Sequence, residues 1–174
     1  LRVNSGGGEA SASEDIRLAL ARLAEKKPLI ASMGGIAGSG GYMVALPAQR
    51  IFAEQTTLTG SIGVLALSPS LGGALNHAGV TIDTIRTHDH ADAASSLRPL
   101  TEEEFAELDA HVDYVYRHFV SVVAQARNQT IDHVHEAAEG RVWSGREAQL
   151  HRLVDEIGGL DAAIAAAGQA AGLS

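Results

Sequence analysis

The segment Met33–Tyr42 constrains this chain most, because five of its ten residues are glycine and one serine, Ser39, stands among them. The apolar run Pro28–Ser32 before it is typical of a short buried strand, and Tyr42–Leu46 after it is typical of a helix that Pro47 ends. Many nucleophiles are mounted on such a turn, because glycines let a substrate approach the backbone and the helix start supplies free N–H groups. A tight turn with an incidental serine fits the spacing equally well, since glycine-rich turns are common.

Composition limits the classes of function. The chain has 174 residues, of which 45% are hydrophobic, so it can bury the core of one domain. Its formal charge of −8 argues against nucleic acid and anionic membranes as partners. It contains no cysteine, which excludes disulfides and thiolate metal ligands.

The chain opens in an unusual way. Leu1–Val3 is typical of the end of a strand, and a second glycine-rich loop, Asn4–Gly8, follows at once. We therefore expect residues 1–174 to be a single serine-bearing domain that lacks upstream strands of a longer polypeptide.

The first half of the chain alternates strand and helix patterns. Ser11–Glu14 has the spacing of a capping box and predicts the start of a helix. Ile51–Ala53 and Leu58–Leu65 are strand candidates, and Val80–Ile85 alternates apolar and polar residues as a half-buried strand does. Strands that alternate with helices predict an α/β fold with mainly parallel strands.

The second half is mostly helical. Leu71–His77 predicts a short helix, and Thr101–Glu104 is a capping box that opens the longest one. We interpret Val142–Gly145 as a turn and Asp161 as the cap of the last helix. The longest helix carries an apolar stripe, for which we expect either the core or a partner subunit as neighbour. The stripe consists of Phe105, Leu108, Val112, Val115, Phe119, Val122 and Ala126.

Several ordered motifs together resemble one family. "LRVNSGGG", "SMGGIAGSGGY", "LTGSIGV", "RPLTEEE" and "GRVWSGREA" resemble, in this order, segments of the serine–lysine signal peptide peptidases, peptidase A. The likeness is greatest to the C-terminal half of the long, two-repeat bacterial form and covers nearly the whole chain. It implies a Clp-protease/crotonase-like α/β fold and an endopeptidase that degrades cleaved signal peptides by acyl transfer.

The resemblance also implies residue roles. Ser39 matches the nucleophile, Gly7 and Gly40 match the two backbone N–H donors of the oxyanion hole, and Ser61 matches a serine that hydrogen-bonds the general base. Two positions depart from the family pattern. Gly6 replaces a proline, which loosens the loop, and Glu9 replaces a serine, which brings a negative charge near the oxyanion loop.

The family's general base is a lysine, and the chain has only Lys26 and Lys27. Both stand at the end of a predicted helix, where solvated positive charge is common. Ala91 falls where the short form of the family has its lysine. We therefore expect the base to come from a missing segment or from another subunit.

The resemblance further implies partners and a location. We expect cleaved signal peptides as substrates, a homo-oligomer, an upstream half of the enzyme that supplies the lysine, and attachment to the periplasmic side of the bacterial inner membrane. We expect neither a cofactor nor a catalytic metal ion, and no nucleic acid partner.

Three alternatives remain at this stage. His88 and His90 lie in the loop that carries the short form's base, so a Ser39–His90 pair is conceivable. The two histidines could also hold a metal ion together with Asp89 or Asp92. A solvated polar loop is the simpler interpretation. The chain could instead be an inactive peptide-binding or assembly domain of the same fold. It could also be a thioester enzyme of the crotonase type, in which the paired N–H groups stabilise an enolate.

Overall fold

The computed structural model describes residues 1–173. The chain divides into two units, which we describe separately: unit 1 comprises Leu1–Val64 and the chain from Val115 onward, and unit 2 comprises Leu65–Tyr114. The elements in chain order are β1 (Arg2–Ser5), α1 (Ala10–Ala24), β2 (Ile30–Gly38), α2 (Gly40–Ala45), β3 (Arg50–Ala53), β4 (Leu58–Gly60), α3 (Gly72–His77), α4 (Glu102–Arg127), α5 (Ile131–Ala137), β5 (Val142–Ser144), α6 (Gly145–Leu150), β6 (Glu156–Ile157) and α7 (Leu160–Ala170).

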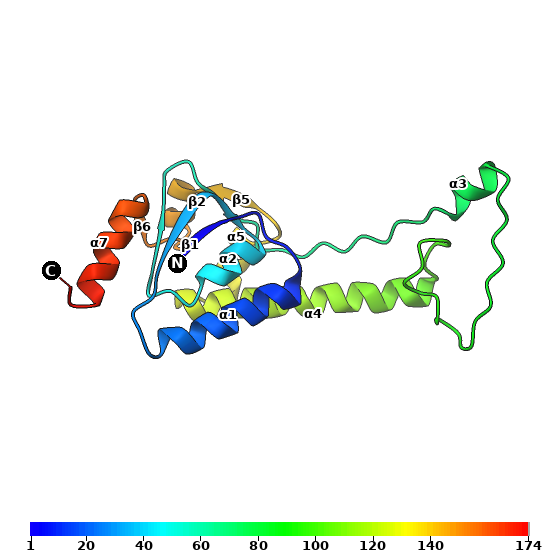
Figure 1. The fold of residues 1–174 in the computed structure, drawn as a ribbon, viewed down its shortest axis with the longest axis horizontal. Helices are drawn as coiled ribbons and strands as arrows, with labels where there is room; N and C mark the ends of the chain where they lie inside the picture. The colour runs from blue at the N-terminus through cyan, green and yellow to red at the C-terminus, as the bar shows by residue number, and fades with distance from the viewer. Residues whose placement is uncertain (174) are drawn as a thin grey trace. The chain divides into compact units, whose positions relative to one another are not determined.

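The sheet of unit 1 is built around β2 (Figure 1). β2 pairs in parallel with β1, β3 and β4; β6 extends the sheet in parallel beyond β3, and β5 adds an antiparallel edge beside β4. Helices flank this mostly parallel sheet, so the predicted α/β fold is confirmed.

The alternation of side chains along the strands divides the core between the two faces of the sheet. Ala31 and Met33 of β2 join the larger cluster, to which α2, α4, α5 and α6 also contribute. Ile30 of β2 and Phe52 of β3 point to the other face, where they pack with Ala163 and Ala166 of α7. β2 is therefore covered on both sides, which explains its nearly continuous apolar sequence.

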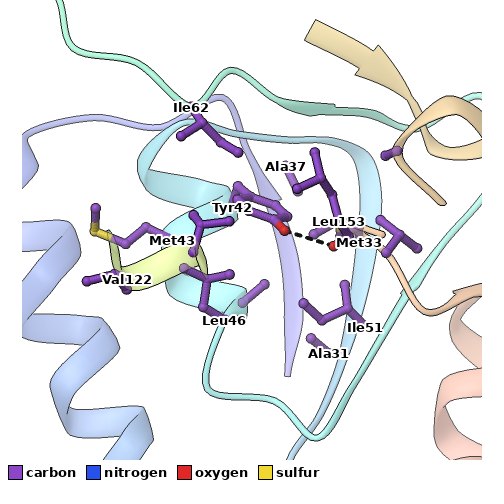
Figure 2. Packing of buried hydrophobic residues seen from close by; sticks show 14 of the residues in the cluster. Ala31, Met33, Ala37, Tyr42, Met43, Leu46, Ile51, Ile62, Val122 and Leu153 are labelled. Carbon is purple, nitrogen blue, oxygen red and sulfur yellow. Dashed lines mark hydrogen bonds between the residues drawn. The ribbon is translucent and has the colours of Figure 1, made fainter. Parts of the chain in front are cut away.

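Tyr42 stands at the centre of the larger cluster (Figure 2). Its ring is fully buried between β2 and α2, and its hydroxyl donates a 2.9 Å hydrogen bond to the carbonyl of Leu153. Burial raises the pKa of this phenol above its ordinary range, so the hydroxyl keeps its proton and remains a donor. Tyr42 thereby anchors the short helix that follows Ser39 to a distant part of the chain.

Unit 2 contains α3 and the first part of α4. The predicted capping box is confirmed: Thr101 Oγ accepts from the Glu104 N–H at 3.2 Å, and the Glu104 carboxylate accepts from the Thr101 N–H at 2.8 Å. The same carboxylate pairs with Arg98, which also pairs with Asp92. These ion pairs connect the polar loop before α4 to the first turn of the helix.

The predicted strand over Val80–Ile85 is wrong. The segment has no strand conformation, and Ile85 is 98% exposed. An alternating pattern forms a strand only where a neighbouring strand accepts its hydrogen bonds, and all the strands found among residues 1–173 belong to unit 1.

The apolar stripe of α4 also divides between the units. Phe119 and Val122 are buried in the core of unit 1, whereas Phe105, in unit 2, is 62% exposed. The core interpretation is therefore confirmed for Phe119 and Val122, whereas Ala126 at the end of the stripe is exposed.

Three smaller expectations are corrected. The carboxylate of Glu9, not Ser11, caps α1, because it accepts from the backbone N–H groups of Ser11 and Ala12. The expected turn over residues 142–145 begins with strand β5, which pairs with β4. Gly159, not Asp161, is the N-cap of α7, and Asp161 lies in its first turn.

Candidate active site

The candidate site lies where three parallel strands end. β2 pairs with β1 on one side, with Ser5 opposite Ala37, and with β4 on another, with Gly60 opposite Gly38. Since the carboxyl ends of parallel strands meet at one edge of a sheet, the residues that follow β1, β2 and β4 come together. The sequence-predicted residues Gly7, Ser39 and Ser61 are those residues.

Ser39 joins β2 to α2 in a strained conformation. Its φ is 51° and its ψ is −123°, a region that residues with a Cβ rarely adopt. Strand β4 and helix α2 hold this geometry, because the Ser39 N–H donates to the Gly60 carbonyl at 2.9 Å and the Ser39 carbonyl accepts from Met43 N at 3.0 Å. Such strain clusters at functional sites, and here it presents the serine at the end of the central strand.

Gly7 lies directly against Ser39. A Cβ atom built on Gly7 would lie 2.7 Å from Ser39 Cβ and 3.0 Å from the backbone nitrogen of Gly40. Gly7 also has a φ of 111°, which favours glycine. The structure thus brings Gly7, Ser39 and Gly40 together, although Gly7 lies 32 positions before Ser39 in the sequence.

The two candidate N–H donors differ in their present partners. Gly40 is the first residue of α2, so no carbonyl one turn earlier in that helix accepts from its N–H. The Gly7 N–H donates to Ser5 Oγ at 3.2 Å. A substrate oxyanion at Gly7 would therefore have to displace the Ser5 hydroxyl, a contact that sequence reasoning missed because it depends on the loop backbone.

Ser61 lies beside the turn before Ser39. A Cβ atom on Gly38 would lie 3.4 Å from Ser61 Cβ, and Ser61 itself has a φ of 48°. Its N–H donates to the Arg141 carbonyl at 2.8 Å. Ser61 therefore lies near the end of β2, which Ser39 follows.

Neither lysine of the chain comes near this edge of the sheet. The N-terminal part of α1 approaches the site, since a Cβ atom on Gly40 would collide with Ser13 Oγ. Lys26 and Lys27 are exposed and follow the opposite end of that helix. The eleven helical steps from Ser13 to Ala24 span about 16 Å, too far for either ammonium to reach Ser39.

The histidine alternative gains no geometric support. His90 Nδ1 lies 3.0 Å from Glu104 Oε1, and its Nε2 lies 3.6 Å from Glu103, all within unit 2. The hydrogen bond to Glu104 raises the pKa of His90, which favours an imidazolium rather than a base. Within residues 1–173 no group of three or more His, Cys, Asp or Glu side chains is arranged to hold a metal ion.

The carboxylate of Glu9 is hydrogen-bonded to the start of α1. It accepts from Ser11 N at 3.0 Å and from Ala12 N at 2.6 Å, and these bonds lower its pKa. The ionised group therefore serves as the N-cap of α1, where negative charge is favourable.

The chain is similar in sequence to known proteins. A family model described as Peptidase family S49 matches residues 21–174. The chain is 41% identical to Protease 4 of Salmonella typhi and 39% identical to the chloroplastic serine protease SPPA of Arabidopsis thaliana, each over 99% of the chain. It spans only 28% and 26% of those proteins, respectively.

Among solved structures, a ClpP1 mutant from Listeria monocytogenes aligns with a TM-score of 0.59 at 15% identity, covering 94% of this chain and 74% of that one. At this level of identity the likeness concerns the fold alone, and it confirms the expected Clp-protease architecture.

Proposed function

Because the chain belongs to peptidase family S49, we propose that it supplies the nucleophile and the oxyanion hole of a serine endopeptidase. The observation that carries the proposal is the meeting of Gly7, Ser39 and Gly40 at the carboxyl edge of the sheet. A nucleophile needs oxyanion donors at this kind of distance, and nothing in a purely structural turn demands a strained serine.

The proposed reaction is acyl transfer. Ser39 Oγ attacks the peptide carbonyl and gives its proton to a general base, while the developing oxyanion accepts from the N–H groups of Gly7 and Gly40. Collapse of the tetrahedral intermediate breaks the C–N bond and releases the amine, which takes the proton from the base. Water then attacks the Ser39 ester and releases the carboxylic acid, so that the serine is restored.

The base in this proposal is a lysine from outside the described residues, on another segment of the polypeptide or another subunit. Lys26 and Lys27 stand at the far end of α1, which supports an external source. A lysine serves as a base only when burial or neighbouring groups keep it neutral, and Ser61 is the proposed hydrogen-bond partner that orients it.

We further propose cleaved signal peptides as substrates, in a homo-oligomer on the periplasmic side of the inner membrane. No helix among residues 1–173 is long and apolar enough to cross a bilayer. The apolar part of α4 that unit 2 exposes, including Phe105, is the proposed contact with a neighbouring subunit.

A second candidate is an inactive peptide-binding domain of the same fold. The hydrogen bond from the Gly7 N–H to Ser5 Oγ favours it, because that bond occupies one of the two donors. In this reading Ser39 holds the turn and performs no chemistry.

The test is hydrolysis of a fluorogenic peptide with small apolar residues, by this chain and by the full polypeptide that its gene encodes. Each is compared with its Ser39→Ala variant and with Ser121→Ala, which alters an exposed serine on α4. Turnover by the full polypeptide alone, lost in Ser39→Ala and kept in Ser121→Ala, is the expected result. Equal turnover with and without the Ser39 hydroxyl would exclude Ser39 as the nucleophile, and no turnover by a folded full polypeptide would favour the binding domain.

A further inference from the structure

A cavity of about 330 Å³ opens beside Ser39 within unit 1. Gly7 and Gly40, the proposed oxyanion donors, form part of its wall. The rest is largely apolar, with Val3 from β1, Ile16 from α1 and Val44 from α2. The cavity therefore adjoins the place where the proposed reaction puts the scissile carbonyl.

The position of this cavity decides which part of a substrate it receives. When the carbonyl oxygen of a substrate residue lies between the Gly7 and Gly40 N–H groups, the side chain of that residue begins at the Cα atom bonded to the carbonyl carbon. A cavity that shares both glycines is within reach of that side chain. Its occupant is therefore the residue that contributes the scissile carbonyl.

Glu9 gives this cavity its charge. Of the described residues that line the cavity, Glu9 carries a negative charge and none carries a positive charge. Backbone N–H groups of Ser11 and Ala12 and the Ser11 hydroxyl hold both carboxylate oxygens in place. These bonds fix the position of the carboxylate, which is exposed to solvent, beside the cavity.

We propose that this cavity selects a lysine or arginine at the residue that contributes the scissile carbonyl, with Glu9 as the specificity-determining residue. This inference rests on the proposed peptidase function. Lysine and arginine bury an apolar stem and keep the charged end in water, which matches apolar walls with a carboxylate at the rim. In the family pattern a serine stands at the position of Glu9, so the carboxylate is a departure of this chain from that pattern.

The same selectivity fits the proposed substrates. A signal peptide has a positively charged first region followed by an apolar stretch. A site that takes a basic residue would cut such a peptide in or next to its charged region.

The experiment compares two peptides that are identical except for the residue before the scissile bond, lysine in one and norleucine in the other. Norleucine keeps the apolar stem and lacks the charge. Since an exposed ion pair contributes little, we expect the full polypeptide to prefer lysine by about three- to fivefold in kcat/KM. The preference should shrink at high salt.

The variants isolate the charge of Glu9. In Glu9→Gln the single amide oxygen can take the place of only one of the two carboxylate oxygens that accept from Ser11 N and Ala12 N. α1 therefore keeps part of its cap, and the lysine preference should disappear. Glu25→Gln removes an exposed carboxylate at the opposite end of α1 and should keep it. Equal rates for both peptides in the unmodified protein, or a preference that survives in Glu9→Gln, would overturn the assignment.

A binding measurement separates this inference from the peptidase proposal. Fluorescence anisotropy of labelled peptide amides that end in lysine or norleucine is measured on the Ser39→Ala variant. Tighter binding of the lysine peptide that Glu9→Gln abolishes supports the cavity assignment, even where no hydrolysis is detected and the peptidase proposal fails. Hydrolysis with no preference in rate or binding leaves the peptidase proposal standing and removes the cavity assignment.

Discussion

Gly7 and Ser39 lie so close that a Cβ atom on Gly7 would stand 2.7 Å from Ser39 Cβ. The pairing of β1 with β2 creates this approach, because both strands run in the same direction and end side by side. It places a backbone N–H next to the only serine in the glycine-rich turn.

Gly7→Ala should reduce the rate of peptide hydrolysis at least as much as the loss of one oxyanion donor does, which is on the order of 10²–10³-fold. The added Cβ would meet Ser39 and also lie 3.1 Å from the Gly38 carbonyl, at a φ of 111° that alanine rarely adopts. Peptide hydrolysis measures the effect. Gly6→Ala is the control, because its Cβ would make an ordinary 3.5 Å contact with Ile36 Cδ1. Equal losses in both variants would contradict a specific role for Gly7.

Ser39→Gly should be more stable than Ser39→Ala by about 1 kcal/mol. Both variants lose the hydroxyl, but only glycine relieves the strained backbone at φ 51°. Urea denaturation followed by circular dichroism measures the difference. A Ser39→Ala variant as stable as Ser39→Gly would mean that the turn stores no strain.

Tyr42→Phe should destabilise unit 1 by about 1–2 kcal/mol, since it leaves the buried Leu153 carbonyl without the donor at 2.9 Å. Thermal or urea unfolding is the measurement. Tyr114→Phe removes a hydroxyl from a side chain that is 70% exposed and should change stability far less. If the two variants unfold alike, the Tyr42 hydrogen bond does not stabilise the fold.

Arg98→Ala should loosen unit 2. Arg98 donates to Asp92 Oδ1 and to both oxygens of Glu104, each at 2.7 Å, and the Glu104 side chain is only 3% exposed. Without the guanidinium, this carboxylate has no arginine partner, and we expect faster cleavage of residues 88–100 in limited proteolysis. Arg86→Ala is the matched control, because Arg86 reaches only Asp92, at 3.3 Å. Unchanged proteolysis in Arg98→Ala would contradict the prediction.

Acid should weaken the same cluster. The hydrogen bond from Arg98 lowers the pKa of Asp92 from 3.8 to about 2. A carboxyl group whose pKa is lowered in the folded protein stabilises the folded state at every pH above its ordinary pKa. This contribution is lost as the pH falls through the lowered pKa. An NMR titration of the Asp92 carboxyl carbon should give a midpoint near the lowered value, and Arg98→Ala should return it toward 3.8. A midpoint unchanged by the substitution would rule out Arg98 as the cause.

Local sequence predicted the elements that depend on neighbours in the chain. A strand before Ser39, a helix after it and the capping box at Thr101 are confirmed, but β2 extends to Gly38, through most of the segment expected to be a turn. Their signals are an apolar run, a glycine-rich turn and a cap spacing, which act over a few residues. The strand predicted over Val80–Ile85 is wrong, because a strand also needs a hydrogen-bonding partner, and a local pattern does not reveal whether one is present.

The sequence by itself determined the α/β fold and the turn that presents Ser39, since both follow from local patterns of apolar residues and glycines. Only the tertiary structure decided that Gly7 and Ser61 join Ser39, because parallel pairing unites the ends of strands distant in sequence. The tertiary structure likewise turned Glu9 from an isolated charge into a helix cap beside a cavity. Geometry of this kind depends on the register of the sheet, which is set by the packing of the whole core.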